Sequence, residues 1–144
     1  MADVTFKAKT RVESGVKIHC EARGLSFVLD EPKNLGGSDE GMNPVEALLS
    51  ALGACKCIVG TMFAEAQGIK LKSIAVDLEG TLNPDGFSGK DPKAKIGFSK
   101  IHSIFHIEAE NTAEELEEYI RFIEGNCPVQ DTIVNSPEMT HELK

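Results

Sequence analysis

Four cysteines are the residues of this 144-residue chain best suited to chemistry: Cys20, Cys55, Cys57 and Cys127. A cysteine thiolate is a nucleophile and a metal ligand, whereas a buried neutral thiol behaves as a small hydrophobic group. The spacing of the four is not that of a secreted domain held together by disulfide bonds. The sequence therefore predicts cysteines that are either reactive or simply buried.

Cys127 has the most suggestive local pattern, because Pro128 follows it and proline suits the first position of a helix. A cysteine at the N-cap faces free backbone N–H groups and the positive end of the helix dipole, and both favour the thiolate. The alternative is that Asn126 or Cys127 caps a structural turn and has no other role. On local sequence alone, Cys127 is the more activated thiol.

Cys55 and Cys57 lie in an apolar segment with helical periodicity. At ~100° per residue, Cys55 lies about 40° from the centre of the apolar stripe, and Cys57 points to the opposite side of the helix. The two sulfurs cannot form a disulfide without unwinding the helix. A buried, unreactive role is favoured for Cys57, and also for Cys20 in an expected strand. The stripe is defined by Leu48, Leu52, Val59 and Met62.

The helix that carries Cys55 has clear boundaries. Asn43 can cap it, Pro44 suits its first position, and Glu46 occupies the position of a capping-box acid. Gly68 supplies a stop at its C-terminal end.

The rest of the chain predicts short strands and two further helical segments, which gives the α+β class with antiparallel pairing in a single domain over residues 1–144. Charged and small residues between these segments predict turns and exposed loops. The expected strands are Thr5–Arg11, Gly15–Glu21, Leu25–Asp30, Lys70–Leu82, Phe98–Ala109 and Pro137–Leu143; the expected loops are Glu31–Met42 and Asn83–Gly97; the helical segments follow Asn111-Thr112 and run from Cys127 to Val134.

Composition and charge restrict the function classes. The net charge of −8, from 23 acidic and 15 basic residues, disfavours nucleic acid and anionic membranes as partners. We find no apolar run of ~18 residues that would span a membrane, and Met1–Lys9 lacks the features of a signal peptide. We therefore expect a cytoplasmic protein with no nucleic-acid or membrane partner and no cofactor.

Three segments that end at Cys55 and one block that begins at Cys127 resemble the two cysteine motifs of the OsmC/Ohr family. The order of elements is similar over essentially the whole chain. The resemblance implies an OsmC-like fold, with antiparallel sheets packed around a long central helix, and an intertwined homodimer with its two sites at the subunit interface. The resembling segments are Asp30–Pro32, Leu35–Gly41, Asn43–Cys55 and Cys127–Val129.

The resemblance also implies a reaction. The first cysteine of the family's peroxidases attacks the peroxide and becomes a sulfenic acid, and the second condenses with it to a disulfide. These roles carry over onto Cys55 and Cys127. The implied substrates are organic hydroperoxides, and the implied reductant is a dithiol, of lipoyl type in the best-known branch.

Two departures from the family pattern concern the groups around the thiol. The peroxidase branches place a glutamate directly after Asn-Pro, where this chain has Val45, and the nearest acid is Glu46. Glu46 either orients an arginine or serves only as a capping residue, since it lies about 180° around the helix and ~13 Å along it from the reactive thiol. Arg11 and Arg23 are the candidates for the family's arginine; Arg11 is preferred, and the alternative for each is a surface role.

Two other functions stay open. Val45 in place of the glutamate favours a non-catalytic redox or ligand-binding protein that has kept the thiols. A metal-binding module would use cysteines with a histidine such as His19 or His102, although the spacing fits no zinc pattern.

Overall fold

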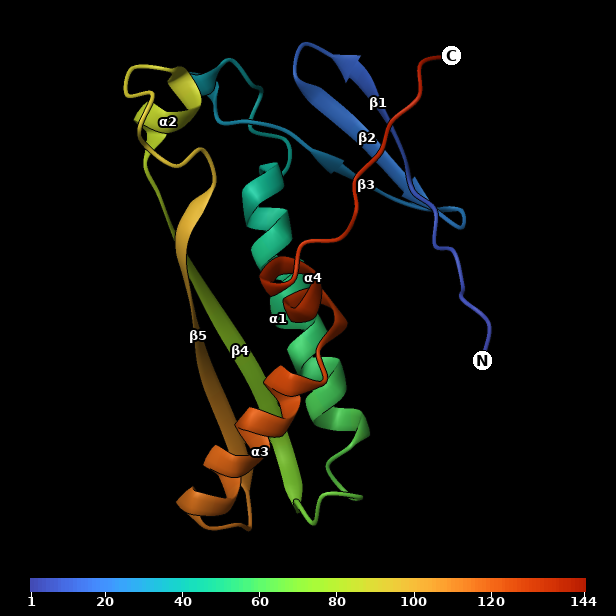
Figure 1. The fold of residues 1–144 in the computed structure, drawn as a ribbon, viewed down its shortest axis with the longest axis vertical. Helices are drawn as coiled ribbons and strands as arrows, with labels where there is room; N and C mark the ends of the chain where they lie inside the picture. Colours follow the sequence, from blue (N-terminus) through green and yellow to red (C-terminus); the bar gives the residue numbers. More distant parts are fainter. The chain divides into compact units, whose positions relative to one another are not determined.

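The alternating N-terminal segments form a three-stranded antiparallel sheet in the computed structural model, which describes residues 1–144 (Figure 1). Its strands are β1 (Lys9–Ser14), β2 (Lys17–Ala22) and β3 (Leu25–Leu29). They belong to the first of two compact units, Met1–Leu48 and Leu49–Lys144. β1 begins four residues later than the strand expected from Thr5, and the other two expected strands are confirmed to within two residues.

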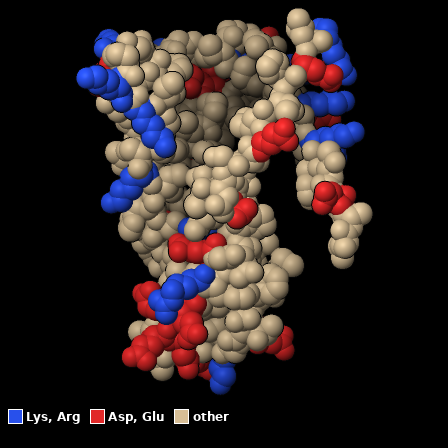
Figure 2. Space-filling view, in the orientation of Figure 1, with Lys and Arg blue, Asp and Glu red and all other residues tan.

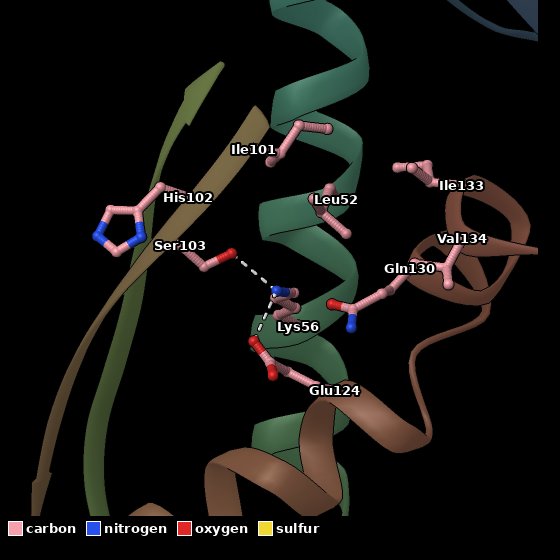
Figure 3. A pocket seen from close by; sticks show the side chains of 9 residues that line it. All are labelled: Leu52, Lys56, Ile101, His102, Ser103, Glu124, Gln130, Ile133 and Val134. Atoms are coloured by element: carbon pink, nitrogen blue, oxygen red, sulfur yellow. Dashed lines mark hydrogen bonds and ion pairs between the residues drawn. The ribbon is translucent and has the colours of Figure 1, made fainter. Parts of the chain in front are cut away.

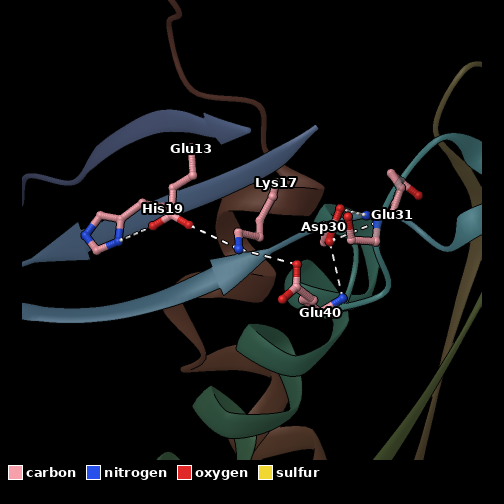
Figure 4. A network of polar contacts seen from close by, with 7 residues as sticks. Glu13, Lys17, His19, Asp30, Glu31 and Glu40 are labelled. Carbon is pink, nitrogen blue, oxygen red and sulfur yellow. Dashed lines mark hydrogen bonds and ion pairs between the residues drawn. The ribbon is translucent and has the colours of Figure 1, made fainter. Parts of the chain in front are cut away.

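Asp30 organises the long loop that follows β3, in which Lys33–Leu35 forms a short 3₁₀ turn. Its buried carboxylate accepts hydrogen bonds from the backbone N–H groups of Glu31 at 2.8 Å and of Ser38 and Glu40 at 3.2 Å each (Figure 4). These bonds, the one from Glu31 foremost, lower the pKa of the Asp30 carboxyl. Asp30, which belongs to a segment that resembles the family motif, therefore stabilises the conformation of the loop.

The tip of this loop is also tied to the sheet. The Lys17 ammonium on β2 lies 3.3 Å from Glu40 Oε2 and 3.5 Å from Glu13 Oε2, and His19 Nδ1 lies 3.4 Å from Glu13 Oε1 (Figure 4). The hydrogen bonds and charges of Glu40 raise the pKa of Lys17.

Helix α1 (Pro44–Met62) leads into the second unit, where β4 (Leu71–Leu82) and β5 (Phe98–Ala109) pair as an antiparallel ribbon. The short α2 (Pro84–Ser88) lies between these strands, within the segment expected to be a loop. The helices α3 (Ala113–Gly125) and α4 (Pro128–Val134) follow, and α1, α3 and α4 lie on one side of the ribbon (Figure 1).

The core of the second unit lies where α1 and α3 meet the ribbon. Gly60 allows the close approach, because a Cβ there would meet the side chains of Ile74 and Ile123. Tyr119 is 3% exposed, and its hydroxyl donates to the Gly60 carbonyl at 2.5 Å. The buried cluster consists of Val59, Ala64, Ile69, Tyr119 and Ile123.

The buried face of α1 differs from the expected stripe. Leu52 and Val59 are buried, but Leu48 and Met62 are 41% and 71% exposed. Lys56 is buried at the centre of the face instead. Only the middle of the stripe is packed against other residues, so its two ends are exposed.

The expected strand over Pro137–Leu143 is wrong, because this segment has no regular structure and joins neither sheet. A strand exists only where another strand offers its backbone groups, and the alternating pattern of the segment cannot supply that partner.

The acidic residues of α3 form its solvated side, and they gather at the lower end of the view in Figure 2.

By length and composition alone, α1 could cross a membrane, which corrects the expectation that no segment qualifies. Core helices of soluble proteins pass the same test. Lys56, in the middle of α1, is buried against protein groups, with its ammonium on Ser103 and Glu124. These contacts make α1 a core helix.

Candidate active site

Cys55 and Cys127 are brought together by three helices of the second unit. Cys55 lies on α1, half-buried against the core cluster. α3 ends at Gly125, and Cys127 is the N-cap of α4, where its sulfur accepts a hydrogen bond from the Gln130 N–H at 3.4 Å. The Cys127 thiol is 1% exposed, and Cys55 is near enough to influence its pKa. The two cysteines are therefore neighbours in the fold.

Burial raises the pKa of the Cys127 thiol, and the neighbouring Cys55 raises that pKa further. The N–H groups of Gln130 and Val129 act in the opposite direction, as expected at a helix N-terminus, but they do not outweigh burial. At Cys127 itself, the activation expected from the helix N-terminus is therefore outweighed by burial, which favours the neutral thiol.

The other two cysteines lie apart from this pair. Cys20 is 7% exposed in β2, as expected of a buried residue. Cys57 is half-buried on α1, two residues beyond Cys55. The structure contains no group of three His, Cys, Asp or Glu side chains that could hold a metal ion.

Lys56 is the residue of this region that sequence reasoning missed. Its side chain is 3% exposed, and its ammonium donates to Ser103 Oγ at 2.7 Å and pairs with Glu124 Oε1 at 3.2 Å. The same ammonium lies 5.4 Å from the centre of the Phe105 ring, within the range of a cation–π contact. The sequence signal that could have identified Lys56 is a single charged residue in an apolar helix, four residues after Leu52.

A cavity of about 300 Å³ lies beside this ion pair (Figure 3). Its walls come from α1, β5, α3 and α4, and they combine aliphatic side chains with an amide, a hydroxyl, an imidazole and the charged pair. The lining residues are Leu52, Lys56, Ile101, His102, Ser103, Glu124, Gln130, Ile133 and Val134.

Glu46 closes a capping box at the start of α1. The Asn43 side chain accepts from the Glu46 N–H at 2.9 Å, and Glu46 Oε1 accepts from the Asn43 N–H at 3.4 Å. The capping interpretation of Glu46 is thus confirmed, and an additional catalytic role stays a prediction. Val45, in the position of the family glutamate, is 37% exposed.

Both candidate arginines belong to the first unit. Arg11 lies on β1 opposite His19, with its side chain exposed. Arg23 lies in the hairpin turn between β2 and β3, where it and Gly24 have positive φ angles of 55° and 82°, as a two-residue turn requires. The assignment of Arg11 to the thiol site stays a prediction.

The family model described as "OsmC-like protein" matches residues 37–142, which include both cysteines of the pair. The chain belongs to the OsmC-like family. An OsmC-like protein of Mycoplasma pneumoniae, solved by crystallography, has the same fold with a TM-score of 0.80 at 22% identity, over 94% of this chain and 91% of that one. The expected α+β, OsmC-like fold is therefore confirmed.

Two curated relatives of this OsmC-like chain are each named hydroperoxide reductase. The protein of Mycoplasma genitalium is 29% identical over 97 residues, and that of Mycoplasma pneumoniae is 27% identical over 94 residues. Each match covers 65% of this chain and 63% of the relative.

Proposed function

We propose that this OsmC-like chain is a cytoplasmic, thiol-dependent peroxidase that reduces organic hydroperoxides through Cys55 and Cys127. The observation that carries the proposal is the placement of the two thiols: Cys127 is buried at the N-cap of α4, and Cys55, packed against the core from α1, is near enough to influence its pKa. The names of the two curated relatives support the same substrate class.

The proposed reaction has three steps. The Cys55 thiolate attacks one oxygen of the peroxide, so that an S–O bond forms, the O–O bond breaks, and the alkoxide leaves as an alcohol after taking a proton from solvent. The resulting sulfenic acid condenses with the Cys127 thiol to a disulfide and releases water. A dithiol reductant then restores both thiols and is itself oxidised to a disulfide.

The surroundings of Cys55 favour an organic substrate. Cys55 packs against a cluster that contains Val59 and Ile123, and such a wall suits the alkyl part of a hydroperoxide better than a small polar peroxide. Arg11 is the proposed cation for the peroxide oxygens, Glu46 is the proposed acid that orients it, and a homodimer is the proposed assembly. These three assignments rest on the family resemblance.

Thiol titration before and after one equivalent of cumene hydroperoxide tests the proposal. We expect the loss of two thiols per peroxide and a Cys55–Cys127 disulfide in mass-spectrometric mapping. No loss of thiols, or a disulfide that involves Cys20 or Cys57, would contradict it.

A second candidate function is a non-catalytic redox or ligand-binding protein. It is favoured by Val45 in place of the family glutamate and by the engagement of Glu46 in the capping box. In that case the thiols oxidise slowly or not at all with cumene hydroperoxide, so the same titration separates the two functions.

A further inference from the structure

Lys56 and Glu124 link the two helices that lead to the reactive pair. Lys56 follows Cys55 directly on α1, and Glu124 lies in the last turn of α3, three residues before Cys127. Their side chains point toward each other, with 3.2 Å between Nζ and Oε1 (Figure 3). The ion pair and the adjoining backbone therefore connect Cys55 to its neighbour Cys127.

Lys56 is the fixed end of this link. Its ammonium is held by Ser103 and lies over the ring of Phe105, both on β5, and the side chain is 3% exposed. A buried charge requires a partner, whereas the side chain of Glu124 is 38% exposed and could be solvated without one. The position of Lys56 therefore determines where Glu124 lies.

The connection from Glu124 to Cys127 is short and stiff. Only Gly125 and Asn126 separate them, and the Asn126 side chain donates to the Phe122 carbonyl at 2.8 Å. The Asn126 N–H also donates to the carbonyl of Ile123 at 3.2 Å. A displacement at the end of α3 is therefore passed on to Cys127.

We propose that Lys56 is a positioning residue, which acts through Glu124 to hold the Cys127 thiol within reach of Cys55 and so favours formation of their disulfide. For the peroxide-driven rate, this inference rests on the proposed function. The equilibrium of the disulfide with glutathione needs no peroxide: the Cys55–Cys127 dithiol and oxidised glutathione yield the protein disulfide and two reduced glutathione molecules.

The test measures that equilibrium for the wild type, Lys56→Met, Glu124→Gln and Tyr119→Phe. We expect each substitution in the ion pair to lower the equilibrium constant by about tenfold or more, because effective concentration falls steeply with small displacements. Tyr119→Phe is the matched control, since it removes the hydrogen bond from α3 to Gly60 of α1 but leaves the ion pair intact. We expect it to stay within about twofold of the wild type.

An equilibrium constant within about twofold of the wild type for Glu124→Gln, or an equal loss in Tyr119→Phe, overturns the inference. Glu124→Gln decides the matter alone if Lys56→Met does not fold, because the Glu124 side chain is partly solvated. Disulfide formation with glutathione but no reaction with cumene hydroperoxide in the wild type would reject the proposed function and leave the test of Lys56 valid. With peroxide, Lys56→Met should retain sulfenic acid for longer, as measured by dimedone trapping.

Discussion

At Cys127, two physical effects act on the thiol in opposite directions. The N-terminus of α4 provides backbone N–H groups that favour the thiolate, whereas 99% burial and the contact with Cys55 favour the neutral form. Burial dominates because desolvation of a thiolate costs more free energy than a long N–H···S hydrogen bond provides. The bond from Gln130 is 3.4 Å long. A raised pKa at Cys127 agrees with the proposed roles, in which Cys55 makes the first attack and Cys127 is the second reactant.

Serine substitutions should separate these roles. Cys55→Ser should abolish peroxide turnover, because a serine hydroxyl is not ionised at neutral pH and does not form a sulfenic acid. Cys127→Ser should complete one turnover and stop as a sulfenic acid, since nothing remains to condense with it. The measurements are peroxide consumption and mass spectrometry after dimedone labelling.

Cys57→Ser and Cys20→Ser are the controls, and they should keep turnover close to that of the wild type. Retained turnover in Cys55→Ser, with dimedone labelling of Cys127, would show that the two roles are reversed.

At the scale of elements, the helix starts could be predicted because their chemistry is local. Thr112 and Glu115 form a capping box at α3, and Cys127 caps α4 with its own side chain. Each cap depends on residues within three positions of it, so the sequence contains the whole interaction.

Features that depend on a distant surface could not be predicted in the same way. In the sequence, Lys56 is a charge that interrupts an apolar stripe. Its burial is explained by Ser103 and Glu124, which lie 47 and 68 residues further along the chain. The proximity of Cys55 and Cys127 likewise depends on the packing of α3 on α1. The resemblance to a family, not the local pattern, identified this pair in advance.

The loop after β3 gives a prediction of its own, through Asp30. Because the folded protein lowers the pKa of this carboxyl below its ordinary value of 3.8, Asp30 stabilises the fold above that pH. The contribution is lost as the pH falls through the lowered pKa. Asp30→Asn should therefore be less stable than the wild type at pH 7, and the difference should shrink below pH 3.8. Urea unfolding at a series of pH values measures it.

Asp39→Asn is the matched control, since Asp39 is an exposed acid of the same loop with a φ of 57° that asparagine also adopts. It should change stability little at any pH. Equal effects of the two substitutions would show that the loop does not depend on the buried carboxylate.

At the scale of the whole molecule, the first unit presents an apolar sheet face. Cross-strand pairing puts Cys20 opposite Phe27, and Leu25 lies on the same face two residues before Phe27. Leu25 and Phe27 are 65% and 59% exposed, and Val12 on β1 is 63% exposed. A three-stranded sheet with an uncovered apolar face gains stability when another surface covers it.

We predict that a second copy of the chain covers this face, and that the protein sediments as a homodimer at micromolar concentration. Leu25→Glu and Phe27→Glu should each shift it toward the monomer, because a charge there would be buried without a partner. Ser26→Glu is the matched control, since Ser26 is exposed on the opposite face of the same strand and should leave the dimer intact. A wild-type protein that sediments as a stable monomer, or a Ser26→Glu variant that dissociates as readily as the other two, would contradict this assembly.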